Sequence, residues 1–251
     1  MSEASPDRDH TFALQKKMTD PSRQPLEVYH LSHDLRGPLN SILGFAELLL
    51  EEIEGPLNEM QQTDLAAIYQ SAQNLLYLVN TVVDLSKLEA NRLIFDFGPV
   101  DLAQVIHEIA ASNFGTAKPD PVEVVANLAQ TVLPIRGDRD RIEQMLKSLL
   151  RFAFKVKKKG QITLTAQSDT QTVTIEVALG EIRLPQAELA ELFELMAKVD
   201  SSGRSELGRG GLELPLARYL AEKQQGRIWA EHKNDTHLFF YISLPAQETN
   251  S

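Results

Sequence analysis

The sequence contains no cysteine in its 251 residues, which excludes disulfides, thiolate nucleophiles and cysteine-based metal sites. No run approaches the roughly 18 consecutive apolar residues that a membrane-spanning helix requires. The amino-terminal segment lacks the basic region and the apolar stretch of a signal peptide. The six histidines are scattered, so no spacing indicates a zinc site. These absences favour a cytoplasmic protein with no membrane insertion and no metal ligand set.

Positive charge is scarce relative to negative charge, because 25 Lys and Arg residues oppose 35 Asp and Glu residues and leave a formal charge of −10. An acidic chain repels nucleic-acid phosphate and anionic lipid, so we expect no nucleic-acid partner. The hydrophobic share of 43% and the charged share of 24% are typical of globular proteins. The length suits one large domain or two small ones.

Two apolar runs with heptad spacing follow a polar, proline-containing segment, residues 1–25, which we interpret as a flexible arm. Gly55-Pro56 separates the runs, and Asn58 is placed to cap the second helix. Two such helices form an antiparallel hairpin, and a lone hairpin leaves its apolar seam half covered. The pattern therefore predicts a homodimeric four-helix bundle through residues 26–92. The predicted seam consists of Leu35, Leu39, Ile42, Ala46, Leu49 and Ile53 in the first helix and Leu65, Ile68, Ala72, Leu75, Val79 and Val82 in the second.

Shorter elements follow over residues 93–246, and residues 247–251 form a tail. Helical and alternating patterns are mixed, which predicts an α+β sandwich. We expect Trp229 and the run Phe239–Tyr241 to lie in the core of strands. The predicted helices are Leu102–Ala111, a helix from the cap Asp138 to about Phe154, Gln186–Met196 and Leu214–Lys223. The predicted strands are Val122–Leu128, Gln161–Gln167, Thr172–Val177, Arg227–Glu231 and Leu238–Leu244.

The first helix contains the segment Ser32-His33-Asp34-Leu35-Arg36-Gly37-Pro38-Leu39-Asn40. The seam places His33 outside the helix contact, where its imidazole faces solvent and can meet a partner or a phosphoryl donor. Asp34 can hold the Nδ1–H group and leave Nε2 as the nucleophile. Pro38 costs about 3 kcal/mol inside a helix. An isolated exposed histidine is usually an ordinary surface residue, but the neighbouring acid, arginine and proline favour a chemical role for His33.

The segments SHDLRGPLNSILGFAELL and VVDLSKLEANRLIFDFGPVDL closely resemble the dimerisation and phosphoacceptor domain of bacterial two-component sensor histidine kinases. The resemblance continues through LPIRGDRDRIEQMLKSLL into the family's ATP-binding domain and ends near Leu244. It implies that His33 is the phosphorylated residue and that Asp34 is its general acid/base. It implies supporting positions at Arg36, Pro38 and Asn40. A homodimer and the receiver domain of a response regulator are the implied partners, with room for a separate sensor or kinase.

The nucleotide-binding motifs depart from the family's pattern. Alignment places Ser148 and Phe152 where the family has asparagines that contact ATP and hold Mg²⁺, and a phenyl ring offers Mg²⁺ no oxygen. The family's Asp-x-Gly-x-Gly motif aligns with Leu179–Arg183. In either of two registers that segment has no aspartate to accept a hydrogen bond from adenine, and Glu181 and Arg183 replace the glycines.

Other family positions are partly retained. The resemblance implies cofactor-binding positions at Lys155, which matches a phosphate-contacting lysine, and at Gly210 and Gly211 in the last glycine-rich segment. Glu213 replaces a glycine near the expected triphosphate, where a carboxylate repels phosphate. Gly37 occupies the position at which the family's phosphatase reaction uses Thr or Asn. ATP and Mg²⁺ are therefore expected as cofactors only if this degenerate site is functional.

Three functions remain open on the sequence. The first is a phosphotransfer or pseudokinase module of a phosphorelay, in which His33 exchanges phosphate with a response regulator. The second is an active ATP-dependent sensor histidine kinase that autophosphorylates His33, which needs Mg²⁺ and positioned electrostatics. The third is a non-catalytic dimeric scaffold. The three independent losses on the nucleotide side, of the magnesium asparagine, the adenine aspartate and the lid glycines, favour the first.

Overall fold

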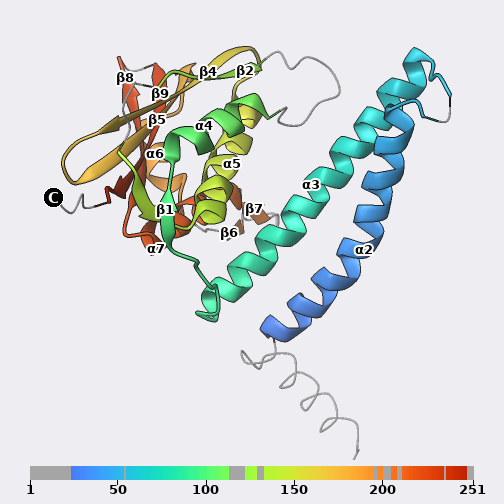
Figure 1. Ribbon diagram of the computed structural model, residues 1–251, viewed down its shortest axis with the longest axis horizontal. Helices are drawn as coiled ribbons and strands as arrows, with labels where there is room; N and C mark the ends of the chain where they lie inside the picture. Colours follow the sequence, from blue (N-terminus) through green and yellow to red (C-terminus); the bar gives the residue numbers. More distant parts are fainter. Residues whose placement is uncertain are drawn as a thin grey trace, which may run out of the picture. The chain divides into compact units, whose positions relative to one another are not determined.

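The computed structural model describes residues 24–53, 55–112, 122–128, 133–194, 197–199, 205–207, 211–234 and 236–247. The chain divides into two compact units between Leu93 and Ile94 (Figure 1). The first holds a pair of helices, and the second combines β-sheet with helices. The predicted order of a helical hairpin and an α+β domain is therefore confirmed. None of the helices in the described ranges combines the length and the apolar character that crossing a bilayer demands.

Helices α2 (Gln24–Leu50) and α3 (Glu59–Glu89) form the hairpin. Asn58 caps α3 as predicted: its side chain accepts a hydrogen bond from the backbone N–H of Gln61 at 2.9 Å, and the Gln61 side chain accepts one from the backbone N–H of Asn58. This reciprocal capping box satisfies two backbone donors that the helix start would leave unpaired. Pro38 lies inside α2. Helix α2 therefore continues past Pro38, although proline lacks the N–H group that would donate one of the helix's internal hydrogen bonds.

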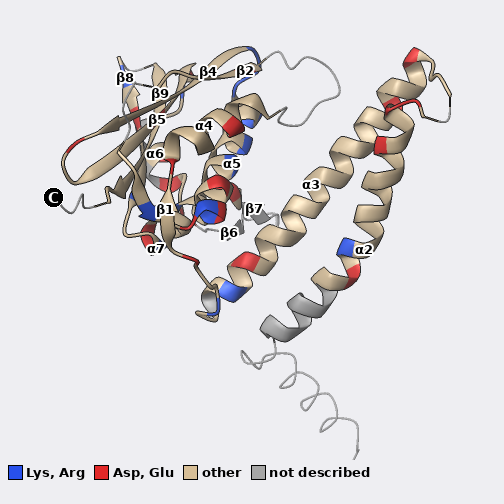
Figure 2. Ribbon diagram, in the orientation of Figure 1, with Lys and Arg blue, Asp and Glu red and all other residues tan. Residues whose placement is uncertain are grey.

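The seam of the hairpin is covered on one side only. Leu39, Ala46 and Ala72 are buried, whereas Ile42 and Leu75 are among the exposed large hydrophobic residues. Between Asp64 and Asp84, α3 carries no charged residue, and Figure 2 shows this uncharged stretch as continuous tan ribbon. The pairing of α2 with α3 thus leaves an apolar face that one hairpin does not cover, as the heptad pattern predicts.

The second unit is built on a five-stranded mixed sheet with the order β2-β4-β5-β9-β8. Neighbouring strands pair antiparallel except β2 and β4, which run parallel. The strands are β2 (Val122–Ala126), β4 (Gly160–Ser168), β5 (Thr172–Glu181), β8 (Arg227–Lys233) and β9 (His237–Pro245). Two separate antiparallel pairs are formed by β1 (Gly98–Val100) with β3 (Ile135–Gly137) and by β6 (Ala197–Val199) with β7 (Ser205–Leu207).

The described residues of this unit form the helices α4 (Leu102–Ala111), α5 (Arg139–Val156), α6 (Gln186–Glu191) and α7 (Glu213–Lys223). Helix α5 begins at the predicted cap Asp138, whose side chain accepts from the backbone N–H of Arg141 at 3.1 Å. The same carboxylate accepts from the backbone N–H of Asp96 at 2.8 Å. One capping residue thus fixes both the start of α5 and the segment that leads into β1.

Helix α6 is shorter than predicted. The sequence pattern extends the helix from Gln186 to Met196, but it ends at Glu191, and Met196 lies outside the described residues. The next side chains, Leu192 and Phe193, are buried, and the Phe193 ring lies 6.1 Å from the ring of Phe240 in an edge-on arrangement. The chain leaves the helix here because these two apolar side chains turn into the core.

The aromatic residues of β8 and β9 do not share one face of the sheet: Phe240 and Tyr241 are buried, as predicted, whereas Trp229 and Phe239 are only half-buried, contrary to the prediction that they are core residues. One face of β9 carries side chains that are at most 2% exposed, namely Leu238, Phe240, Ile242 and Leu244. The alternate positions carry Phe239 and Tyr241, whose rings lie 6.3 Å apart, and Tyr241 stacks on Trp229 at 5.1 Å. Strand alternation sends these rings to the other face of the sheet. Cations cover them there: Arg227 lies 4.4 Å from the Trp229 ring, and Lys233 lies 4.2 Å from the Phe239 ring.

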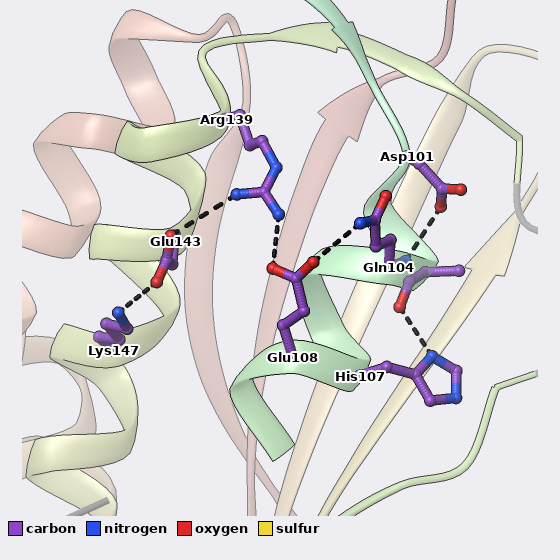
Figure 3. Close-up of polar contacts among 8 residues, drawn as sticks. Asp101, Gln104, His107, Glu108, Arg139, Glu143 and Lys147 are labelled. Carbon is purple, nitrogen blue, oxygen red and sulfur yellow. Dashed lines mark hydrogen bonds and ion pairs between the residues drawn. The ribbon is translucent and has the colours of Figure 1, made fainter. Parts of the chain in front are cut away.

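A chain of polar side chains connects α4 to the first turns of α5 (Figure 3). Glu108 of α4 accepts from Gln104 at 2.8 Å and from Arg139 of α5 at 2.5 Å. Arg139 also approaches Glu143 at 3.8 Å, and Glu143 in turn pairs with Lys147. The hydrogen bond from Arg139 lowers the pKa of Glu108 below its ordinary value. These contacts link the two helices at the surface, beside the apolar side chains that carry most of the packing energy.

Tyr241 makes the stability of this unit sensitive to alkaline pH. Burial raises the pKa of Tyr241, and hydrogen bonds from Lys233 to Tyr241 and Glu176 raise the pKa of Lys233. A group whose pKa is higher in the folded state stabilises the fold below its unfolded pKa, which is about 10 for both residue types. That contribution disappears as pH rises through the folded value, because the unfolded chain releases the proton first.

We therefore expect the free energy of unfolding to fall between about pH 9 and 11 and to fall less steeply in Tyr241→Phe, where only Lys233 contributes. Urea unfolding at one-unit pH intervals measures this slope, with each protein's own value at pH 7 as the reference. Parallel slopes for wild type and variant would contradict the assignment to Tyr241.

Candidate functional site

His33 lies on α2 with its side chain directed to solvent. The side chain is 80% exposed, and that of Asp34 is 81% exposed. The His33 Nδ1 and Asp34 Oδ1 atoms are 3.7 Å apart, which is slightly beyond hydrogen-bond distance. A small side-chain rotation would let the carboxylate accept the Nδ1–H group and leave Nε2 free to act as a nucleophile. The structure thus brings together the two residues that the sequence pairs.

The supporting positions lie on the following turn. Asn40 is exposed, and Pro38 lies one turn after Asp34, whose carbonyl therefore has no N–H donor at that position. Ser41 donates to the carbonyl oxygen of Gly37 at 3.2 Å, which is a local helix contact. A Cβ atom at Gly37 would meet no atom within 4 Å, so nothing in the packing of the hairpin requires glycine there.

Arg36 faces α3 and has a partner that the sequence did not reveal. Its Nε–H group donates to Oδ1 of Asn80 at 3.0 Å. Arg36 and Asn80 lie 22 residues on either side of Asn58, so folding the hairpin about its cap brings them opposite each other. That symmetry is the signal from which the contact could have been found.

The two asparagine positions of the family's metal-binding helix lie on the buried face of α5. Ser148 is fully buried, and Phe152 is 1% exposed. The Phe152 ring meets Phe240 edge-on at 5.7 Å, so this side chain belongs to the contact between α5 and the sheet. An aromatic ring in the core supplies no hard oxygen ligand, and the residues present at this position do not fit Mg²⁺.

The segment aligned with the adenine-recognition motif ends strand β5. Leu179 is fully buried at a bulge where the pairing of β5 with β9 shifts, and Gly180 follows with φ of +74°. The carbonyl oxygen of Leu179 accepts from Lys157 Nζ at 2.5 Å, while Glu181 and Arg183 are exposed. The side chain at the expected aspartate position is thus apolar and enclosed, and it offers adenine no acceptor.

Lys155 and Glu213 form an ion pair between the end of α5 and the start of α7. The Lys155 Nζ atom lies 2.5 Å from Oε1 of Glu213, whose side chain is 4% exposed, whereas that of Lys155 is 59% exposed. The second carboxylate oxygen lies against Gly211, which has φ of +56°. Gly210 lies outside the described residues. The structure thus brings Lys155, Gly211 and Glu213 together. The carboxylate of Glu213 pairs with Lys155, the residue that was expected to contact phosphate.

The location of Glu213 favours its charge. Glu213 is the first residue of α7, where the unpaired backbone N–H groups of the helix create a partial positive charge. A nucleotide phosphate would be attracted by the same lysine and the same helix end. The carboxylate therefore occupies a position whose electrostatics suit an anion, and it offsets the charge of Lys155.

The chain matches two known protein families. Residues 26–91 match the His Kinase A (phospho-acceptor) domain, and residues 137–248 match the family described as histidine kinase-, DNA gyrase B-, and HSP90-like ATPase. The first match contains the helical hairpin with His33, and the second contains α5, α7 and most of the sheet.

Curated relatives carry the same pair of domains within longer chains. The circadian input-output histidine kinase CikA of Synechococcus elongatus is 30% identical over 86% of this chain and 29% of its own length. The signal transduction histidine-protein kinase BarA of Escherichia coli is 30% identical over 86% of this chain and 24% of its own length. The chain thus spans about a quarter of the length of these relatives.

Solved structures agree in fold. Full-length ShkA in complex with AMPPNP has a TM-score of 0.64 and 24% identity, covering 90% of this chain and 47% of its own. Histidine kinase ThkA in complex with the response regulator protein TrrA has a TM-score of 0.54 and 18% identity, covering 98% of this chain and 68% of its own. With a phosphoacceptor hairpin followed by an ATPase-type domain, the chain belongs to the sensor histidine kinase family of two-component systems.

Proposed function

We propose that this protein is a phosphotransfer or pseudokinase member of its family, in which His33 exchanges a phosphoryl group with an aspartate of a response regulator. The observation that carries the proposal is the pairing of a solvent-exposed imidazole with a neighbouring carboxylate, His33 with Asp34. In this proposal residues 26–92 serve as the dimerisation and phosphoacceptor hairpin. Residues 93–246 serve as a degenerate ATP-binding domain.

The reaction at His33 needs no group that the hairpin lacks. Nε2 attacks the phosphorus of the regulator's aspartyl phosphate, the N–P bond forms while the P–O bond to the aspartate breaks, and the aspartate leaves as a carboxylate. The imidazole becomes positively charged, and the carboxylate of Asp34 can accept its Nδ1 proton. The reverse sequence returns the phosphoryl group to a receiver domain. High exposure of His33 suits an exchange between two macromolecules.

The nucleotide side supports an impaired site at three positions. Phe152 stands at the position of a metal-binding asparagine and packs in the core against Phe240. Leu179 stands at the position of the adenine-binding aspartate and is also buried in the core. Glu213 forms an ion pair that neutralises Lys155, the lysine aligned with a phosphate contact. Phosphoryl transfer from ATP depends on Mg²⁺ and on positioned electrostatics. Phe152 removes a ligand for Mg²⁺, Glu213 alters the electrostatics at the phosphate lysine, and Leu179 removes the acceptor for adenine, so ATP is not the phosphoryl donor in this proposal.

An active ATP-dependent sensor kinase is the alternative, and the comparisons favour it. The curated relatives are named as kinases, and the ShkA structure is a complex with AMPPNP. In that function the second domain would bind ATP despite its substitutions and transfer the γ-phosphoryl group to His33.

Phosphoramidate, a small phosphoryl donor, tests the chemistry at His33 without a nucleotide. We expect wild-type protein to form acid-labile phosphohistidine, detected by 31P NMR and mass spectrometry. His33→Ala should reduce labelling at least tenfold, which corresponds to about 1.4 kcal/mol in the barrier. His107→Ala is the matched control, because His107 is also an exposed helical histidine and should leave the label at His33 unchanged. Equal labelling of wild type and His33→Ala would favour the scaffold function.

Labelled ATP with Mg²⁺ separates the two enzymatic functions in the same preparation. The pseudokinase proposal predicts no ATP-derived label at His33 over the time in which phosphoramidate labels it. A phosphohistidine formed from ATP would establish the active kinase instead.

Glu213→Gln tests the electrostatic part of the impaired site. Because the substitution keeps the shape of the side chain and removes a charge next to Lys155, we expect affinity for pyrophosphate to rise about tenfold. Isothermal titration calorimetry measures the change. Glu222→Gln, on the same helix and paired with Arg218, is the charge-matched control and should have no effect. Unchanged affinity in Glu213→Gln would show that the carboxylate does not limit anion binding.

We further propose that the protein is a homodimer through the apolar face of the hairpin. Leu75 is 48% exposed in the single chain, so completing its burial in a four-helix bundle would stabilise the dimer by roughly half of the value for a fully exposed leucine, about 1 kcal/mol per copy. Sedimentation velocity should give twice the chain mass of 28.0 kDa for wild type. Leu75→Glu should shift the protein toward monomer, whereas Asn74→Glu, on the exposed side of α3, should not. A monomeric wild-type protein would exclude the bundle.

A further inference from the structure

The hairpin has three buried polar side chains in the part that carries the phosphoacceptor. Among its described residues, the buried polar side chains are Ser32 at 3% exposure, Thr81 at 1% and Asp84 at 9%. Ser32 immediately precedes His33, and the other two lie on α3 one residue and four residues after Asn80. Burial of a polar group costs free energy unless it is hydrogen-bonded, and the Thr81 hydroxyl has no hydrogen-bond partner in the described part of the chain. Stability alone does not account for the buried hydroxyl of Thr81.

Arg36 and Asn80 border these buried groups and form a direct bond between the helices. The Nε–H group of Arg36 donates to Asn80 Oδ1 at 3.0 Å, and both side chains are half-buried. Arg36 lies three residues after His33, a separation that places two side chains on neighbouring positions of a helix, about 5–6 Å apart at Cβ. Because Asn80 engages only Nε, the terminal N–H groups of the guanidinium are left for another acceptor.

We infer that Asn80 is a positioning residue for phosphoryl exchange at His33, a role that rests on the proposed function of His33. By holding Nε, Asn80 restricts a long side chain that would otherwise sample many rotamers. The planar guanidinium then presents its outer N–H groups to phosphoryl oxygens on the neighbouring imidazole, where they stabilise developing negative charge. Asn80 does not touch the phosphoryl group in this arrangement. It acts through Arg36.

The test measures the rate of His33 phosphorylation by phosphoramidate in four proteins: wild type, Asn80→Leu, Arg36→Gln and the double variant. We expect Asn80→Leu to slow labelling about tenfold, because misplacing a charge-stabilising group costs that order of rate. Asn80→Asp keeps an acceptor oxygen for Arg36 and should restore most of the rate. Asn74→Leu is the control, since Asn74 is an exposed asparagine on the same helix.

The double variant separates positioning from a merely structural role. If Asn80 acts through Arg36, Asn80→Leu should have no further effect on the rate once Arg36 is glutamine. A structural role would instead give additive rate losses that follow the loss in melting temperature, and this result would overturn the inference. So would an Asn80→Leu rate equal to that of wild type while His33→Ala abolishes labelling, because the function of His33 would then stand without Asn80. If wild-type protein is not labelled at all, the proposed function of His33 itself is contradicted.

Discussion

The apolar contact between α2 and α3 determines which side chains the first unit presents. Leu39, Ala46 and Ala72 are buried in that contact, and the 3.6-residue period of a helix then fixes the direction of every neighbour. His33 and Asp34 point to solvent, while Arg36 points toward the opposite helix. A shift of α2 by one residue would rotate its faces by about 100° and would change both the exposure of the imidazole and the contact of Arg36 with Asn80. The exposure of His33 therefore depends on packing that does not involve the imidazole itself.

Helix α5 shows the opposite use of the same periodicity. A helix that lines a nucleotide site and also packs on a sheet needs polar side chains at one boundary of its apolar face. Phe152 extends the apolar face across that boundary, and its edge-on contact with Phe240 adds about 0.5–1.5 kcal/mol to the free energy of unfolding beyond the area that it buries. In the proposed function, a side chain that stabilises the core thus stands at the position aligned with a metal ligand of the family. Leu179 makes a similar exchange at the end of β5.

Local signals in the sequence predicted much of this structure. Asn58 and Asp138 identified the starts of α3 and α5, because capping is a property of a few adjacent residues. The sequence pattern predicted the five strands of the main sheet but not the three-residue strands β1, β3, β6 and β7. It also did not show which residues of β9 face the helices, since Phe239, Phe240 and Tyr241 are all aromatic and only the tertiary packing distinguishes them. The end of α6 was missed for the same reason. The pair Lys155–Glu213 joins residues 58 positions apart, and no local pattern reports that contact. The pair Arg36–Asn80 joins residues 44 positions apart, and only their equal spacing about Asn58 indicates it.

The two long-range pairs have different physical consequences. In Lys155–Glu213 a nearly buried carboxylate meets an ammonium group, and removing the lysine would leave an uncompensated charge in a low-dielectric environment. The two charges of the pair thus balance each other. An incoming phosphate would have to displace the Glu213 carboxylate, which the N-terminus of α7 also stabilises. In Arg36–Asn80 the partner is neutral, so the guanidinium keeps its full charge. The first pair cancels a positive charge where the family binds nucleotide, and the second preserves one a single helical turn from His33.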